Sequence, residues 1–178
     1  MIKNSNIFKL YISVLLCVSV FVLKAQNPFI KNQGQFPKQV KAKVNLPSGS
    51  LFIENGKSVY AFYSADQLVS IHDLSATSKE IDAHAYEMQF INSNTDASTE
   101  FLDESRYYEN YFLGDKSKWA VNVKSYKSIH QNNVYNGIDI QYYVDNGKLK
   151  YDIIVAPNVI PNLIKIKYTG LDKIILDN

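Results

Sequence analysis

Cysteine is almost missing from this chain of 178 residues: Cys17 stands alone, inside an apolar leader. If the leader is removed, the protein has no disulfide and no thiol chemistry, so core packing alone must hold the fold. A domain of about 150 residues buries enough surface for that. Leu16 precedes Cys17 where a lipidated cysteine would follow a small residue, which argues against a lipoprotein.

A surplus of charge is also missing. The formal net charge of +2 includes three lysines of the leader, which has no acidic residue, so the remaining 16 basic and 17 acidic residues give −1. This balance argues against nucleic acid as a partner. Glycine and proline number only 7 and 5, which excludes a collagen-like chain or a flexible linker.

The first 26 residues, MIKNSNIFKLYISVLLCVSVFVLKAQ, have the three parts of a signal peptide. Lys3 and Lys9 form the charged region, residues 10–23 form the apolar run, and the small Ala25 precedes the expected cut. The run is shorter than the roughly 20 residues of a membrane span. Residues 1–25 are therefore predicted to be a cleaved signal peptide, with a retained signal anchor as the alternative.

Apolar and polar residues alternate through much of the remaining chain, residues 26–178. The most regular stretch is 136–158, where Ile138, Ile140 and Tyr142 share one face and an Asp-Asn-Gly turn leads to a return strand with Tyr151 inside. The stretches 40–47, 49–64 and 84–94 alternate in the same way, and Asn55-Gly56 suits a type I′ turn. We predict a single antiparallel all-β domain, most simply a β-sandwich of short strands.

Other segments predict less regular structure. Residues 26–39 are expected to form turns, 65–83 a short helix or a strand, and 95–107 an exposed polar segment. Asp115 is placed to cap one helical turn that leads to Trp119. Two short strands are expected on either side of Thr169-Gly170.

Several separated motifs resemble an uncharacterised N-terminal β domain of Bacteroidetes extracellular proteins. They are FIKNQGQ (29–35), NYFLG (110–114) with Trp119, YNGID (135–139) and YDIIVAP (151–157), although Asn158 stands where that domain has glycine. Such domains precede SBBP repeats, PKD-like domains and gliding-motility-associated C-terminal domains. The resemblance implies a secreted or cell-surface location and supplies no catalytic residues.

Aromatic residues provide the candidate binding site. Tyrosine occurs 13 times, and exposed aromatic side chains are enriched at surfaces that bind sugars or proteins. Strand alternation puts Tyr142 inside and Tyr143 outside. The candidate ligand-binding residues are Tyr107, Tyr108, Trp119 and Tyr143, with core or sheet packing as the competing interpretation.

Metal and cofactor motifs are not found in the sequence. His72, His84 and His130 lack the spacing of a zinc site. Three aspartates are candidate calcium ligands: Asp139, Asp145 and Asp152. However, the sequence has no twelve-residue calcium-binding loop. We therefore expect no metal site and no cofactor.

The expected function is a non-enzymatic extracellular module for adhesion, interaction or structural support. Surface glycans or other extracellular protein domains are the expected partners, and no membrane span is expected after cleavage of the leader. The alternative is a carbohydrate-binding domain or a secreted polysaccharide hydrolase, whose carboxylate pair would come from four acidic residues: Glu100, Asp103, Glu104 and Glu109.

Export is the first testable prediction. The mature protein should begin at or near Gln26 and be found outside the cytoplasm, because the leader has the features of a cleaved signal peptide. N-terminal sequencing of native protein measures this. Full-length protein with Met1, recovered from the cytosol, would contradict it.

Overall fold

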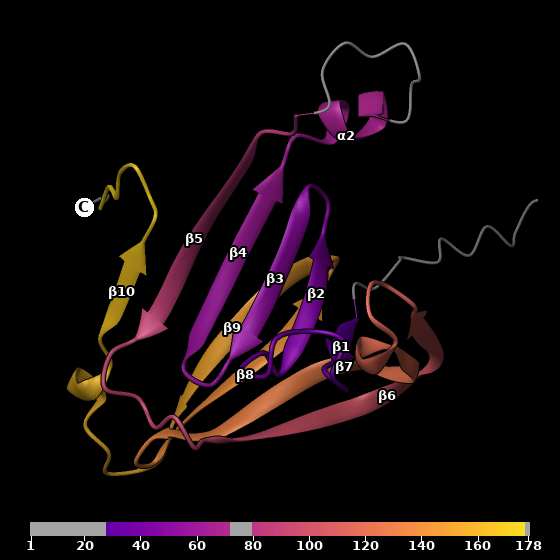
Figure 1. Ribbon diagram of the computed structural model, residues 1–178. Helices are drawn as coiled ribbons and strands as arrows, with labels where there is room; N and C mark the ends of the chain where they lie inside the picture. Colours follow the sequence, from indigo (N-terminus) through magenta and orange to yellow (C-terminus); the bar gives the residue numbers. More distant parts are fainter. Residues whose placement is uncertain (1–27, 72–79, 177–178) are drawn as a thin grey trace, which may run out of the picture.

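The computed structural model describes residues 28–71 and 80–176 (Figure 1). The predicted signal peptide, Cys17 and His72 lie outside these ranges. Thirteen elements occupy the described residues, and all but three are strands. In order, they are β1 (Phe29–Lys31), β2 (Ala42–Leu46), β3 (Gly49–Glu54), β4 (Lys57–Tyr63), α2 (Ala65–Ile71), β5 (Ala83–Phe90), β6 (Ser98–Tyr111), the 3₁₀ turn η1 (Lys116–Lys118), β7 (Ala120–Tyr135), β8 (Ile138–Asp145), β9 (Lys148–Val155), the 3₁₀ turn η2 (Pro161–Leu163) and β10 (Ile166–Thr169).

All the described strands belong to one antiparallel sheet. Its order is β10-β5-β4-β3-β2-β1-β7-β8-β9, and β6 pairs with β7 beside this path. The sheet curls strongly, so that β8 and β9 pass behind β2, β3 and β4 (Figure 1). The all-β antiparallel prediction is confirmed, but the sandwich is wrong: the architecture is a single half-barrel.

Strand β7 is the reason that two sheets do not form. It has 16 residues, and β6 lines one of its edges over most of that length. Along the other edge it pairs first with β1, where Tyr126 faces Phe29, and then with β8, where Ile129 faces Tyr142. One strand thus hydrogen-bonds to both halves of the structure and makes them continuous.

The β8–β9 hairpin follows the predicted alternation. Ile138, Ile140 and Tyr142 are buried on the inner face, while Asn146 and Gly147 have φ angles of 51° and 76°, as a two-residue turn of left-handed residues requires. The return strand is less covered than predicted. Tyr151 is half-buried, because β9 is an edge strand of the open half-barrel.

The β3–β4 hairpin is also confirmed, but its turn is not type I′. Gly56 has a φ of 63°, whereas Asn55 keeps a negative φ. The Asn55 side chain instead donates to the carbonyl oxygen of Thr95 at 2.7 Å and accepts from the Thr99 hydroxyl at 3.3 Å. Contacts of Asn55 with Thr95 and Thr99, around the start of β6, therefore accompany the conformation of this turn.

Three further predictions are corrected. The entry segment contains the short strand β1, which is held by pairing on both edges. The polar segment 95–107 is largely exposed, as predicted, but it forms much of the strand β6, whose register shifts twice and whose Asp103 has a φ of 56°. Of the two strands expected around Gly170, only β10 forms in the described part; residues 65–83 contain a short helix.

The segment between β1 and β2 is organised by Asn32. Its side-chain oxygen accepts hydrogen bonds from the backbone N–H groups of Gly34 and Phe36, at 2.9 and 3.2 Å. Its amide nitrogen donates to the carbonyl oxygens of Phe36, Pro37 and Val40 at 3.3, 2.9 and 2.8 Å. The Asn of the FIKNQGQ motif is thereby given a structural role.

The main core fills the inner face of the curled sheet. It is built from fully buried apolar side chains of both halves, including Phe29, Leu51 and Ile140. At its centre the hydroxyl groups of Ser58 on β4 and Tyr142 on β8 lie 3.2 Å apart. This buried hydrogen bond joins strands that are not neighbours in the sheet.

The Ser58–Tyr142 contact yields a test of the curled architecture. Tyr142→Phe should lower the free energy of unfolding by about 1–2 kcal/mol, because the Ser58 hydroxyl loses its partner in the core. The double variant with Ser58→Ala should cost less than the sum of the two single variants. Urea unfolding measures this; strict additivity would show that β4 and β8 are not in contact.

Candidate functional site

Large apolar side chains are exposed at the end of the β6–β7 hairpin. Tyr107 is 83% exposed, Leu113 77% and Trp119 42%. We call the group the tip cluster; its members are Tyr107, Tyr108, Phe112, Leu113, Trp119 and Val121. Two members, Phe112 and Trp119, are in ring contact, and exposed apolar patches mark interaction sites in soluble proteins.

The tip is held in place by local contacts. Asp115 caps the turn η1 as predicted, its carboxylate accepting a hydrogen bond from the backbone N–H of Ser117 at 2.8 Å. This cap lowers the pKa of Asp115. The indole of Trp119 donates to the carbonyl oxygen of Gly114 at 3.3 Å and packs edge-on against Phe112, with ring centroids 5.2 Å apart. The aromatic rings are thus ordered while one side stays in solvent.

Three of the four predicted binding residues belong to this end of the hairpin: Tyr107, Tyr108 and Trp119. Tyr143 lies elsewhere, on the outer face of β8, opposite Ser128, and its hydroxyl donates to Asp152 at 3.3 Å. The prediction of outward Tyr143 and inward Tyr142 is confirmed by their positions.

Sequence reasoning missed Phe112, Leu113 and Val121. The available signal was the run Tyr111-Phe112-Leu113 directly before Gly114. Successive residues of a strand point to opposite faces, so three apolar residues in a row at a strand end cannot all enter one core.

A second aromatic group covers the inner face of the half-barrel. Tyr60 and Tyr86 stack with ring centroids 4.7 Å apart and planes 9° apart, and Tyr142 packs against Tyr151 at 5.9 Å. Burial, followed by the neighbouring tyrosines, raises the pKa of Tyr60 well above its usual value. Burial raises the pKa of Tyr142 to about 12. This group belongs to the fold, because its rings pack mainly against one another.

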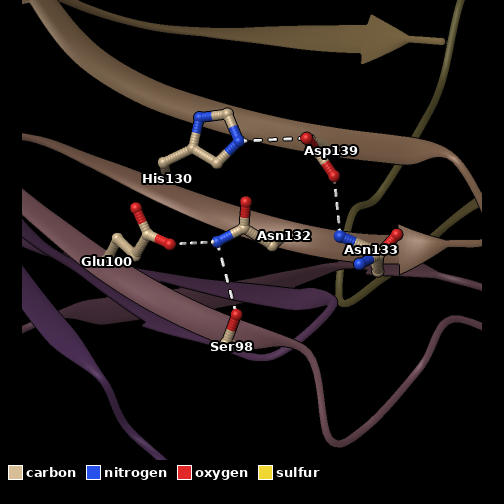
Figure 2. A network of polar contacts seen from close by, with 6 residues as sticks. All are labelled: Ser98, Glu100, His130, Asn132, Asn133 and Asp139. Atoms are coloured by element: carbon tan, nitrogen blue, oxygen red, sulfur yellow. Dashed lines mark hydrogen bonds and ion pairs between the residues drawn. The ribbon is translucent and has the colours of Figure 1, made fainter.

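The outer face of β6, β7 and β8 carries a polar network (Figure 2). The Asp139 carboxylate lies 3.1 Å from Nε2 of His130 and accepts a hydrogen bond from the backbone N–H of Asn133 at 2.7 Å. The amide of Asn132 donates to Glu100 at 2.8 Å and to the hydroxyl of Ser98 at 3.3 Å. Asn133 has a φ of 53° at a register shift of β7, so the aspartate of the YNGID motif secures a bulge.

The four acidic residues of the hydrolase alternative have separate contacts. Glu104 pairs with Lys124 at 3.0 Å, Glu109 accepts from the Tyr111 hydroxyl and Glu100 accepts from Asn132. Asp103 has a positive φ and lies between Leu102 and Glu104, each of which pairs with a residue of β7.

The remaining candidate metal ligands also have partners of their own. Asp145 pairs with Lys150 at 2.6 Å, and Asp152 accepts from Tyr143. Within residues 28–71 and 80–176, no group of three or more His, Cys, Asp or Glu side chains is placed to hold a metal ion. Over the same part of the chain, no helix is both long and apolar enough to span a membrane.

Comparison with known proteins gives a family but no characterised relative. A family model described as a domain of unknown function, DUF7948, matches residues 29–178. No curated protein matches the chain, and no solved structure matches it.

The inner tyrosines predict loss of stability at high pH. The folded state raises the pKa of Tyr142 to about 12 from an unfolded value near 10, so the stability is complete below pH 10 and falls as the pH rises toward 12. The fall should reach about 2 kcal/mol for Tyr142 alone. Urea unfolding from pH 8 to 12 measures it. Tyr142→Phe should flatten the decline, whereas Tyr107→Phe, at an exposed position, should leave it unchanged.

Proposed function

The chain belongs to the DUF7948 family of domains of unknown function, and we propose that it is a non-enzymatic interaction module of an exported protein. It acts in adhesion or as a structural support for further domains, at the cell surface or after secretion. The signal-peptide pattern of residues 1–25 supports the location. The resemblance to N-terminal β domains of Bacteroidetes extracellular proteins supports the same location.

The tip cluster is the observation that carries this proposal. Phe112 and Trp119 are 55% and 42% exposed, yet the ring contact between them and the indole hydrogen bond hold them in one arrangement. Rigid aromatic side chains contribute large contact areas at a small cost in conformational entropy. The cluster therefore has the properties of an aromatic anchor for a partner surface.

Carbohydrate binding is the second candidate, and Trp119 is the observation that favours it. The apolar faces of sugar rings pack on aromatic rings, and Trp119 offers such a ring beside the ammonium group of Lys116, 5.7 Å from its centroid. A polysaccharide hydrolase would additionally need a carboxylate pair about 5–10 Å apart across a bound sugar. Glu104 and Glu109, as acidic residues of the same hairpin, are the residues to test for it.

A binding screen tests the proposal. The purified protein is presented to arrays of glycans and of extracellular protein domains, with and without calcium. The variants Trp119→Ala and Phe112→Ala should weaken binding at least about tenfold, since aromatic anchors cost about 2 kcal/mol or more when truncated. Tyr143→Ala is the matched control, because this tyrosine lies outside the tip cluster.

Two results would count against the proposal. Binding that fails in Tyr143→Ala but persists in both tip variants would move the binding surface to the outer face of β8. Turnover of a polysaccharide that is abolished by Glu104→Gln or Glu109→Gln would establish an enzyme instead.

A further inference from the structure

A surface pocket lies beside β1, and its Phe36 packs edge-on against Tyr111, the residue before Phe112 of the tip cluster, with ring centroids 5.5 Å apart. Its volume is about 440 Å³, within the usual range of small-molecule sites. Three lysines line it, together with two phenylalanines that form its apolar wall; they are Lys31, Lys38, Lys41, Phe36 and Phe101. We call it the lysine pocket.

The three ammonium groups have no acidic partner in the described part of the chain. Ion pairs of the described lysines involve Lys57, Lys124 and Lys150, none of which lines the pocket. The ammonium of Lys31 instead lies over the ring of Phe101, 4.9 Å from its centroid. Such a contact positions the cation while leaving its charge available to an anion.

The wall of the pocket is pre-organised by the segment that Asn32 holds. Asn32 bonds both backbone N–H and carbonyl groups between Gly34 and Val40, so its own amide is fully used in shaping the segment. Gly34 has a φ of 107°, and a Cβ added there would meet no atom within 4 Å.

We propose that the lysine pocket binds an acidic sugar unit of an anionic polysaccharide. A carboxylate or sulfate would be bound by the ammonium groups of Lys31, Lys38 and Lys41, while the apolar face of the sugar ring packs on Phe36. The inference rests on the proposed interaction function and names a class of partner for it. Uronic acids and sulfated sugars share the required chemistry.

The combination of features favours a glycan over nucleic acid. Nucleic-acid binding draws on a basic surface that follows many phosphates, and the chain beyond its leader has a net charge of −1. A compact pocket with three cations and an apolar wall suits one or two charged groups joined to a ring. Duplex DNA therefore serves as the competing probe.

Binding of defined polymers tests the inference. Polygalacturonate supplies carboxylates, carrageenan supplies sulfates, and dextran is the neutral control. The full protein is compared with the triple variant Lys31→Gln, Lys38→Gln, Lys41→Gln. Loss of the three charges should weaken binding of an anionic polymer at least about tenfold. The affinity should also fall with added salt.

A matched control removes three exposed lysines from other surfaces: Lys148→Gln, Lys167→Gln and Lys173→Gln. It has the same net charge as the pocket variant and should bind like the unmodified protein. Thermal unfolding of both triple variants should match that of the unmodified protein. Equal losses in the two variants, or equal binding of dextran or DNA, would overturn the inference.

The outcomes separate this inference from the proposed function. Anionic polymers that still bind Trp119→Ala but not the pocket variant support the lysine pocket. Partners that bind only through the tip cluster, with no affinity for polygalacturonate or carrageenan, overturn the pocket and leave the proposed function standing. If no glycan and no protein binds at all, both are overturned.

Discussion

The fold depends on the pairing of β7 with three neighbours. A strand of 16 residues is long enough to bond β1 near its start and β8 near its end, while β6 follows its other edge. Sheets of many strands twist and curl, so a sheet continued in this way brings its ends toward each other. The inner face can then close on itself, and the contact between Ser58 and Tyr142 follows from that closure.

The same pairing separates the side chains that build the fold from those that stay exposed. The inner face takes the buried aromatic and aliphatic side chains, and the outer face takes polar contacts such as that between His130 and Asp139. Two places belong neither to the buried inner face nor to the polar network of the outer face. They are the far end of the β6–β7 hairpin and the turn-rich segment after β1. The tip cluster lies at the first place and the lysine pocket at the second.

Local patterns in the sequence predicted hairpins well and their assembly poorly. Alternation in residues 138–145 fixes which side chains are buried, because a shift by one residue would turn every side chain to the other face. It does not reveal that β7 also pairs with β1, which is a contact between distant segments. The first part of strand β6 is not predicted because its mostly polar residues do not alternate with apolar ones. The turn at Asn55 is not predicted correctly because it depends on contacts with the distant residues Thr95 and Thr99.

The candidate site was partly predictable for the same reason. Aromatic residues near a predicted turn pointed to Trp119 and its surroundings, whereas the lysine pocket needs Phe101 of β6 beside Lys31 of β1. No spacing of residues in the sequence predicts that Phe101 and Lys31 are in contact.

The β1–β7 pairing also has a kinetic consequence. Phe29 meets Tyr126 only after most of the polypeptide is available, and contacts so far apart in sequence form slowly. If the chain is exported as proposed, slow formation of this pairing would help to keep it unfolded during export.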